Sequence, residues 1–202
     1  MPTYFIADLH FGHTNLLRWE REGFSSIEEH DNFIITLINK RVKPTDILYI
    51  LGDVGDVTKI PQINGRKIMI MGNHDKRSMK EYLGYFAEVY DHPVYLTDSI
   101  LLSHYPVKVE THVLNVHGHL HGALLDSVNH VNVSAHMVLY NPLTMETIYQ
   151  LAGKLPKRDI SFLKEWYADM YVFTKPREDV ITFSNGRVNL VETLQMRKRR
   201  GK

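Results

Sequence analysis

The sequence predicts an α/β fold, and three observations lead to that prediction. Short apolar runs of strand length recur through the first 150 residues. Segments whose apolar residues have helical spacing lie between some of these runs. Several of the runs end directly at Asp, Asn or His, as strands do when they deliver polar groups to one edge of a sheet. With 202 residues, 44% hydrophobic and 23% charged, the chain is long enough to bury one core of its own.

The N-terminal segment predicts a strand followed by a helix. Residues 3–7 form an apolar run that is interrupted by an aspartate, which is typical of a buried strand with a polar end. Ser26 and Glu29 have the spacing of a capping box, and the apolar residues that follow them recur at helical intervals. We therefore predict a helix over 26–41, which ends before Pro44.

The middle of the chain predicts further strands. The apolar runs 47–51 and 67–71 each predict a buried strand that is closed by glycine and a polar residue. A short helix is predicted over 77–84. The runs 94–96 and 100–103 are separated by three polar residues and predict a hairpin.

The remaining elements are predicted from weaker patterns. Strands are predicted over 113–116 and 131–140, and a helix over 142–151, which has proline at its first position. Farther on, an amphipathic helix is predicted over 159–171, and a hairpin is predicted to turn at 184–186. Because the sequence has no repeat and no low-complexity linker, we predict one domain. It comprises a core over 1–151 and a C-terminal extension over 152–202 that packs on it.

Charge and hydropathy exclude some functions. Residues 197–202 contain five basic side chains, whereas the rest of the chain is mildly acidic. We expect this basic tail to be a disordered terminus, and the alternative is that it binds nucleic acid. No apolar run approaches the ~20 residues that cross a bilayer, so we expect no membrane partner. The N-terminus lacks the pattern of a signal peptide, and we expect the protein in the cytoplasm.

Cysteine and histidine contents restrict the kinds of site that are possible. The absence of cysteine excludes disulfides, thiolate zinc sites, iron–sulfur clusters and a thiolate nucleophile. Twelve histidines are present, and histidine is the commonest metal ligand among side chains. A metal site in this chain must therefore consist of imidazole, carboxylate and amide groups.

Metal-ligand residue types follow the predicted strands repeatedly, and this pattern is the main functional signal of the sequence. In chain order they are Asp8 and His10, Asp53, Asn73 and His74, His104, and His119 and His121. Sites in open α/β sheets form outside the carboxyl ends of the strands, so these residues are expected to converge on one edge.

The segments that carry these residues resemble a known family. In order, they are Asp8-Leu9-His10, Gly52-Asp53-Val54-Gly55-Asp56, Gly72-Asn73-His74-Asp75, Ser103-His104 and Gly118-His119-Leu120-His121. Together they resemble the five ordered motifs of calcineurin-like metallophosphoesterases, over residues 3 to about 145. The resemblance implies a four-layer α/β/β/α sandwich of two mixed sheets, with a dimetal site at the C-terminal edge of the strands. It also indicates a small single-domain phosphoesterase.

The resemblance also implies a role for each residue. It implies two divalent metal ions, manganese first and iron, zinc, nickel or cobalt as alternatives. It assigns Asp8, His10 and His121 to one metal ion and Asn73, His104 and His119 to the other. Asp53 would bridge the two, because a shared anion screens the repulsion between close cations. His74 would be the acid or phosphate-binding group, and Asp75 would orient its imidazole.

The expected reaction is hydrolysis of phosphate esters by a metal-activated hydroxide, without a covalent intermediate. The protein phosphatases of this superfamily carry Gly-Asp-x-x-Asp-Arg-Gly and Gly-Asn-His-Glu, and this chain departs from both at Val57-Thr58 and Asp75. A phosphodiesterase or nucleotide phosphatase is therefore expected, with a small phosphorylated molecule or nucleotide as partner. The alternatives are a nuclease, for which the basic tail would bind the substrate, and a non-catalytic metal-binding scaffold. The sequence predicts no oligomeric state.

Overall fold

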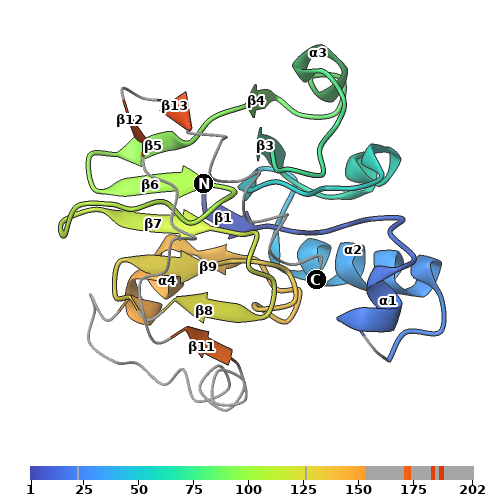
Figure 1. Cartoon of the computed structure of the whole chain (residues 1–202). Coiled ribbons are helices and arrows are strands. Elements are labelled where there is room, and N and C mark those ends of the chain that lie inside the picture. The colour runs from blue at the N-terminus through green and yellow to red at the C-terminus, as the bar shows by residue number, and fades with distance from the viewer. Residues whose placement is uncertain (22, 126, 153–170, 174–182, 185–186, 189–202) are drawn as a thin grey trace.

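The computed structural model describes residues 1–21, 23–125, 127–152, 171–173, 183–184 and 187–188. Two mixed sheets form its centre (Figure 1). The first has the strand order β10-β1-β2-β3-β4, in which β1 to β4 are parallel and β10 is antiparallel to β1. Its strands are β1 (Thr3–Ile6), β2 (Ile47–Ile50), β3 (Arg66–Ile70), β4 (Glu88–Tyr90) and β10 (Leu143–Thr144).

The second sheet has the order β5-β6-β7-β9. Its strands β6, β7 and β9 are parallel, and β5 is antiparallel to β6. The four strands are β5 (Val94–Thr97), β6 (Ile100–Ser103), β7 (Leu114–His117) and β9 (His130–Asn132). Two small pairs complete the strands, namely β8 (Ala123–Leu125) with β11 (Tyr171–Phe173) and β12 (Phe183–Ser184) with β13 (Arg187–Val188). The prediction of an α/β fold with two mixed sheets is confirmed.

One apolar core connects both sheets to the helices. Phe5 and Leu48 from the first sheet and Val116 from the second belong to a single buried cluster. Ile38 of helix α2 and Ile148 of helix α4 belong to the same cluster. The helical segments of the described residues are α1 (Leu16–Trp19), α2 (Ile27–Arg41), the 3-10 helix η1 (Val57–Gln62), α3 (Met79–Tyr82) and α4 (Met145–Leu151).

Helix α2 begins where the sequence predicts, although its cap differs in detail. The Ser26 hydroxyl accepts a hydrogen bond from the Glu29 amide at 3.1 Å, as in a capping box. The Glu29 carboxylate, however, accepts from the amide and hydroxyl of Ser25. A full capping box is found at α3, where Ser78 and Glu81 satisfy each other's backbone amides. Helix α3 is shorter than the predicted span of 77–84, and α1 and η1 are not predicted by the sequence.

The segment after β9 contradicts the predicted strand over 131–140. Strand β9 ends at Asn132, and the next residues run between the two sheets. The Val133 amide donates to the carbonyl of His117 in the second sheet at 2.7 Å, while the Val133 carbonyl accepts from the amide of Ala7, directly after β1 of the first sheet, at 2.9 Å. The chain then turns, with positive φ at Leu139 and Tyr140. The apolar run is buried because it joins the two sheets, and the sequence pattern cannot distinguish this from a long strand.

The parts of the chain predicted beyond residue 152 are only partly described. The predicted helix over 159–171 and the basic tail over 197–202 lie outside the described residues, apart from Tyr171 in β11. In the described part of the chain, no helix combines the length and apolar character that crossing a membrane requires.

The site depends on the packing of the central strands, and a substitution of Leu48 in β2 tests the contribution of that packing to stability. Its side chain is fully buried, so Leu48→Ala removes packed atoms and leaves a cavity. We expect the free energy of unfolding to fall by about 2–5 kcal/mol, measured by chemical denaturation. Leu83→Ala is the matched control because Leu83 is 52% exposed, and it should change stability by at most about 0.5 kcal/mol. Equal effects of the two substitutions would contradict the assignment of Leu48 to the core.

Candidate metal centre

The predicted ligand residues occupy sharp turns at the carboxyl ends of the strands. Five of them adopt left-handed backbone conformations, which non-glycine residues rarely do. Their φ values are 55° at Asp8, 50° at His10, 53° at Asp53, 68° at His119 and 50° at His121. Such conformations cost roughly 1–3 kcal/mol each and persist only where the surrounding structure enforces them. The described chain therefore concentrates backbone strain at the predicted site.

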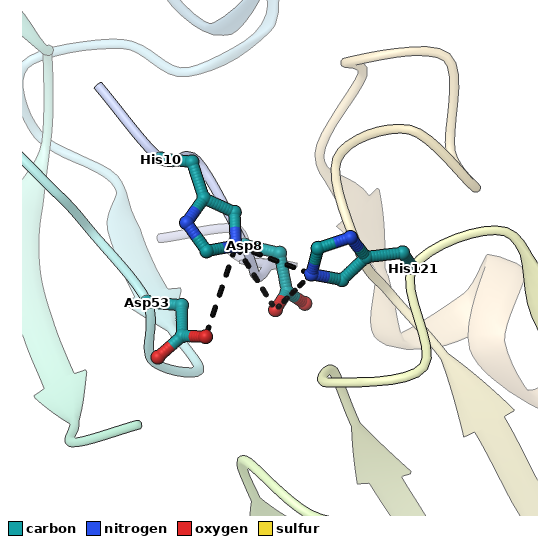
Figure 2. A group of neighbouring side chains, drawn as sticks. All are labelled: Asp8, His10, Asp53 and His121. Atoms are coloured by element: carbon teal, nitrogen blue, oxygen red, sulfur yellow. Dashed lines mark hydrogen bonds and ion pairs between the residues drawn. The ribbon is translucent and has the colours of Figure 1, made fainter. Parts of the chain in front are cut away.

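Four of these side chains converge on one point (Figure 2). One potential ligand atom from each of Asp8, His10, Asp53 and His121 lies within 4.8 Å of those of the other three. The two Nε2 atoms of His10 and His121 are 3.2 Å apart. His10 Nε2 also lies 3.7 Å from Asp53 Oδ2, and His121 Nε2 lies 3.6 Å from Asp8 Oδ1. The predicted ligands of the first metal ion and the predicted bridging residue are thus neighbours.

The two oxygens of Asp8 have different surroundings. Oδ2 accepts hydrogen bonds from the His119 amide at 2.9 Å and from the Ser134 hydroxyl at 2.7 Å. Oδ1 is buried, faces His10 and His121, and has no hydrogen-bond donor within the described residues. A buried carboxylate oxygen without a donor is unfavourable on its own but is suited to bind a cation. This oxygen, two imidazoles and a second carboxylate fit a divalent transition metal.

The two oxygens of Asp53 also have different surroundings. Oδ1 accepts a hydrogen bond from the His74 amide at 2.7 Å, which fixes the carboxylate. Oδ2 lies 3.7 Å from Nε2 of His10 and 3.5 Å from Nε2 of His104. Asp53 therefore faces one predicted ligand of each metal ion with the same oxygen.

The remaining predicted ligands form a second group beside Asp53. Asn73 Oδ1 lies 2.9 Å from His104 Nε2 and 3.1 Å from His119 Nδ1. The Nδ1 atom of His104 lies 2.9 Å from the Leu51 carbonyl, which can only accept, so Nδ1 carries the proton. In the neutral ring, the Nε2 lone pair then faces Asn73 and Asp53. All seven predicted ligand residues are brought to one edge by the carboxyl ends of β1, β2, β3, β6 and β7.

The electrostatics of the histidines differ with their neighbours. Burial, with the charges of His121 and Arg21, lowers the pKa of His10 far below its ordinary value. His10 is therefore a neutral imidazole, the form that binds metal ions. Burial opposes protonation of His104 as well, but the carboxylates of Asp53 and Asp8 outweigh it and raise the pKa of His104. The acidic groups thus make this position favourable for positive charge.

His74 and Asp75 are placed differently from one another. His74 is exposed, and its ring centroid lies 5.5 Å from that of His10 and 6.1 Å from that of His13. The Asp75 carboxylate is buried and accepts from the amides of Gly72 and Asp53, both at 2.7 Å, and from that of Val54 at 3.0 Å. Among the described residues, no hydrogen bond joins Asp75 to the His74 ring. Asp75 therefore holds the turns after β2 and β3 together, which differs from its predicted role of orienting His74.

Sequence reasoning missed several groups that contact the ligands. Glu20 accepts a hydrogen bond from Nδ1 of His121, which leaves Nε2 facing the cluster. Burial alone would lower the pKa of His121, but this bond and the charge of Asp8 raise it. Asn132 donates to the His121 carbonyl at 3.1 Å, and Ser134 holds Asp8. None of these residues lies in a recognisable motif, so the sequence carries no local signal for them.

Two glycines of the motifs are required by close approach to the carboxylates. A Cβ atom on Gly118 would lie 2.4 Å from Asp8 Oδ2, and one on Gly72 would lie 2.3 Å from Asp53 Oδ1. Both distances are shorter than any side chain tolerates. The backbone can therefore approach these carboxylates only where the side chain is a hydrogen atom.

Known proteins that resemble this chain include two sequences and one solved structure. Uncharacterized protein MJ1445 of Methanocaldococcus jannaschii is 30% identical over 170 residues, which are 75% of this chain and 91% of that protein. The gene 66 protein of Mycobacterium phage L5 is 28% identical over 165 residues, 61% of this chain and 79% of the phage protein. The crystal structure of the protein of unknown function AQ665 from Aquifex aeolicus has a TM-score of 0.61 and 28% identity. That similarity covers 74% of this chain and 98% of that chain.

The sequence profile of the calcineurin-like phosphoesterases matches residues 1–187, nearly the whole of the chain. The matched region includes every strand-end residue described above. Members of this family generally hydrolyse phosphate esters in a metal-dependent reaction. On this match, which covers far more than half of its length, the chain belongs to the calcineurin-like phosphoesterase family.

Proposed function

We propose that this protein binds two divalent metal ions and hydrolyses phosphate esters. The observation that carries the proposal is the position of Asp53 Oδ2 between His10 of the first group and His104 of the second. The Oδ1 atom of Asp8 supports it, because this atom is directed at the first group and no donor among the described residues satisfies it. Two bound cations would supply Lewis acidity toward the phosphoryl oxygens and would acidify the attacking water.

The protein groups would hold these ions in two sets. Asp8, His10 and His121 would bind the first ion, and Asn73, His104 and His119 the second, with Asp53 shared. Hydrogen bonds from the protein itself fix the carboxylates of Asp8 and Asp53 in these turns. The nitrogen and oxygen donors suit manganese, which we propose first, and also iron, zinc, nickel or cobalt.

His74 is the proposed acid for the departing oxygen. Its ring is exposed at the edge of the cluster, beside His10, where a substrate can reach it. Its backbone amide donates to Asp53 Oδ1, so the position of this residue is tied to the carboxylate that the two groups share. A proton donated from the imidazole would stabilise the alkoxide or ribose oxygen as the phosphorus–oxygen bond breaks.

We propose a small phosphodiester or a nucleotide as the substrate. Exposed Lys76 and Arg77 lie two and three positions after His74 and add positive charge to this segment of the chain, which favours an anionic substrate. Cleavage of nucleic acid is the second candidate, because residues 197–202 are strongly basic. Inclusion of a single-stranded oligonucleotide beside small esters separates these two possibilities.

The proposed function is tested by removing and restoring metal. The protein is stripped with a chelator and then assayed on bis-(p-nitrophenyl) phosphate, p-nitrophenyl phosphate and a single-stranded oligonucleotide. We expect background turnover without metal and recovery on adding manganese, because the metal ions supply the acidity that the side chains lack. The diester should be hydrolysed fastest. Equal turnover by stripped and manganese-loaded protein would exclude the mechanism, and inactivity with every metal would favour a non-catalytic scaffold.

The role of His74 is tested by His74→Ala in the manganese-loaded protein. The substitution removes the imidazole but keeps the backbone amide that holds Asp53, so metal binding should be unchanged. On an ester with a poor leaving group, kcat should fall by a factor of roughly 10²–10⁴, the usual contribution of a general acid. On p-nitrophenyl esters, whose leaving group needs no proton, the loss should be smaller.

His112→Ala is the matched control for this experiment. His112 is also an exposed histidine, with 65% of its side chain accessible, and it pairs with Glu110 away from the site. It should retain full turnover on both kinds of ester. If His74→Ala kept full activity on the poor leaving group, another residue would have to donate the proton.

A further inference from the structure

A buried arginine lies behind the turn that carries Asp8 and His10. Arg21 is only 2% exposed, yet its guanidinium makes no ion pair with a carboxylate in the described residues. Instead, Nη2 donates to the carbonyl of Asp8, and Nη1 donates to the carbonyl of Leu9 at 3.0 Å. The guanidinium therefore binds the two consecutive peptide groups that connect two predicted metal ligands.

Arg21 is the first member of a chain of hydrogen bonds, and the chemistry of its groups determines which atom donates in each bond. Arg21 Nη1 lies 2.7 Å from His30 Nε2, and His30 Nδ1 lies 2.9 Å from Asp31 Oδ1. A guanidinium only donates, so His30 Nε2 must accept and His30 Nδ1 carries the proton that Asp31 accepts. His30 is thus a neutral ring held in one tautomer between a cation and an anion.

The chain of hydrogen bonds returns to the same turn. The second oxygen of Asp31, Oδ2, accepts a hydrogen bond from the Gly12 amide at 3.0 Å. Arg21 therefore binds the start of the segment 8–12, and Asp31 binds its end. Both His30 and Asp31 belong to helix α2 and are buried. The helix therefore holds these two side chains in place against the segment 8–12.

This arrangement explains how the strained turn is held. Asp8 and His10 both have positive φ, and their neighbouring peptide groups must be rotated out of the ordinary strand orientation. The guanidinium stabilises the rotated peptide groups because it donates hydrogen bonds to the carbonyls of both Asp8 and Leu9. The Asp31 carboxylate accepts from the Gly12 amide at the other end of the turn. Burying a guanidinium, an imidazole and a carboxylate is a poor way to stabilise a core, since apolar groups of similar volume do so at least as well. Their orienting effect on the turn is a better account of them.

We propose that Arg21, His30 and Asp31 are positioning residues that hold Asp8 and His10 in the conformation that binds metal. The proposal rests on the proposed metal site. We call the hydrogen-bonded chain of Arg21, His30 and Asp31 the relay. The proposal predicts that disturbing the relay weakens metal binding without removing any ligand. Groups that orient metal ligands from behind contribute about tenfold to a hundredfold in metal affinity.

The deciding variant is Asp31→Asn. Asparagine has the shape of aspartate but only one accepting oxygen, whereas the Gly12 amide and His30 Nδ1 both donate to this side chain. One of the two donors must therefore face the amide NH2 group, and the relay is broken with little change in volume. Arg21→Lys is the second variant, because it keeps the positive charge and loses the fork that reaches two carbonyls.

The chain offers a matched control for each variant. Asp91 and His92 form the same type of pair, with Oδ1 and Nδ1 2.8 Å apart, but both are exposed and lie away from the site. Asp91→Asn is therefore the control for Asp31→Asn. Arg66 is an exposed arginine paired with Glu88 at 2.8 Å, and Arg66→Lys is the control for Arg21→Lys.

The measurement is binding of manganese to each full-length protein after metal removal, by calorimetric titration. Thermal unfolding midpoints are recorded without metal and with saturating manganese. We expect Asp31→Asn and Arg21→Lys to lose about tenfold or more in affinity and to show a smaller metal-induced rise in the midpoint. The two controls should stay within about twofold of the unsubstituted protein.

Three outcomes would overturn the proposal. Unchanged manganese affinity in folded Asp31→Asn and Arg21→Lys would show that the relay does not position the ligands. A lower midpoint without metal, combined with an unchanged metal-induced rise, would show that the relay serves only stability. If Asp31→Asn did not fold, the manganese affinity of Arg21→Lys would decide by the same comparison. If the unsubstituted protein bound no manganese, zinc or iron, the proposed function would fail together with this inference. Binding by the unsubstituted protein and equal binding by the variants would remove the inference alone.

Discussion

The hydrogen bonds of the Asp8 carboxylate are the interaction on which the rest of the site depends. Asp8 follows β1 of the first sheet, whereas the His119 amide and the Ser134 hydroxyl that bind its Oδ2 atom follow strands of the second. One carboxylate oxygen thus holds the ends of both sheets together. The other oxygen is buried, faces His10 and His121, and receives no hydrogen bond from the part of the chain that the structure describes. The same contact joins the two sheets and leaves one carboxylate oxygen suited to bind a cation.

The site is maintained against local conformational preference. Left-handed backbone at Asp8, His10 and Asp53 is unfavourable for each residue alone, so it must be imposed by contacts from outside the turn. These contacts come from different elements. The Ala7 amide binds Val133 between the sheets, the Asp75 carboxylate holds the Asp53 amide, and Arg21 binds the carbonyls beside Asp8. A rigid α/β scaffold therefore bears the strain that the ligand arrangement requires.

The sequence predicted what is encoded locally and missed what is encoded at long range. Strands β1, β2 and β3 were predicted within a residue or two, because a buried parallel strand is a short apolar run with polar residues after it. The strand-end order of Asp8, Asp53 and His104 predicted that the ligands converge. Ser134 was missed because it is 126 positions from Asp8, and nothing near it in the chain signals that contact. For the same reason residues 133–140 were wrongly predicted as strand, since a segment joining two sheets is as apolar as a strand within one.

The hydrogen bonds of three aspartates near the site distinguish proposed metal ligands from structural residues, which the sequence alone cannot do. Asp8, Asp53 and Asp75 all follow strand ends and are all buried. In Asp8 and in Asp53, one oxygen is bound by protein donors and the other faces histidine nitrogens. In Asp75, both oxygens are bound by backbone amides, two at Oδ2 and one at Oδ1. A carboxylate with both oxygens engaged has little left to offer a cation, whereas one with a free, inward-facing oxygen does. The distinction between a proposed metal ligand and an aspartate that holds turns together therefore follows from the donors around each oxygen and not from the residue type.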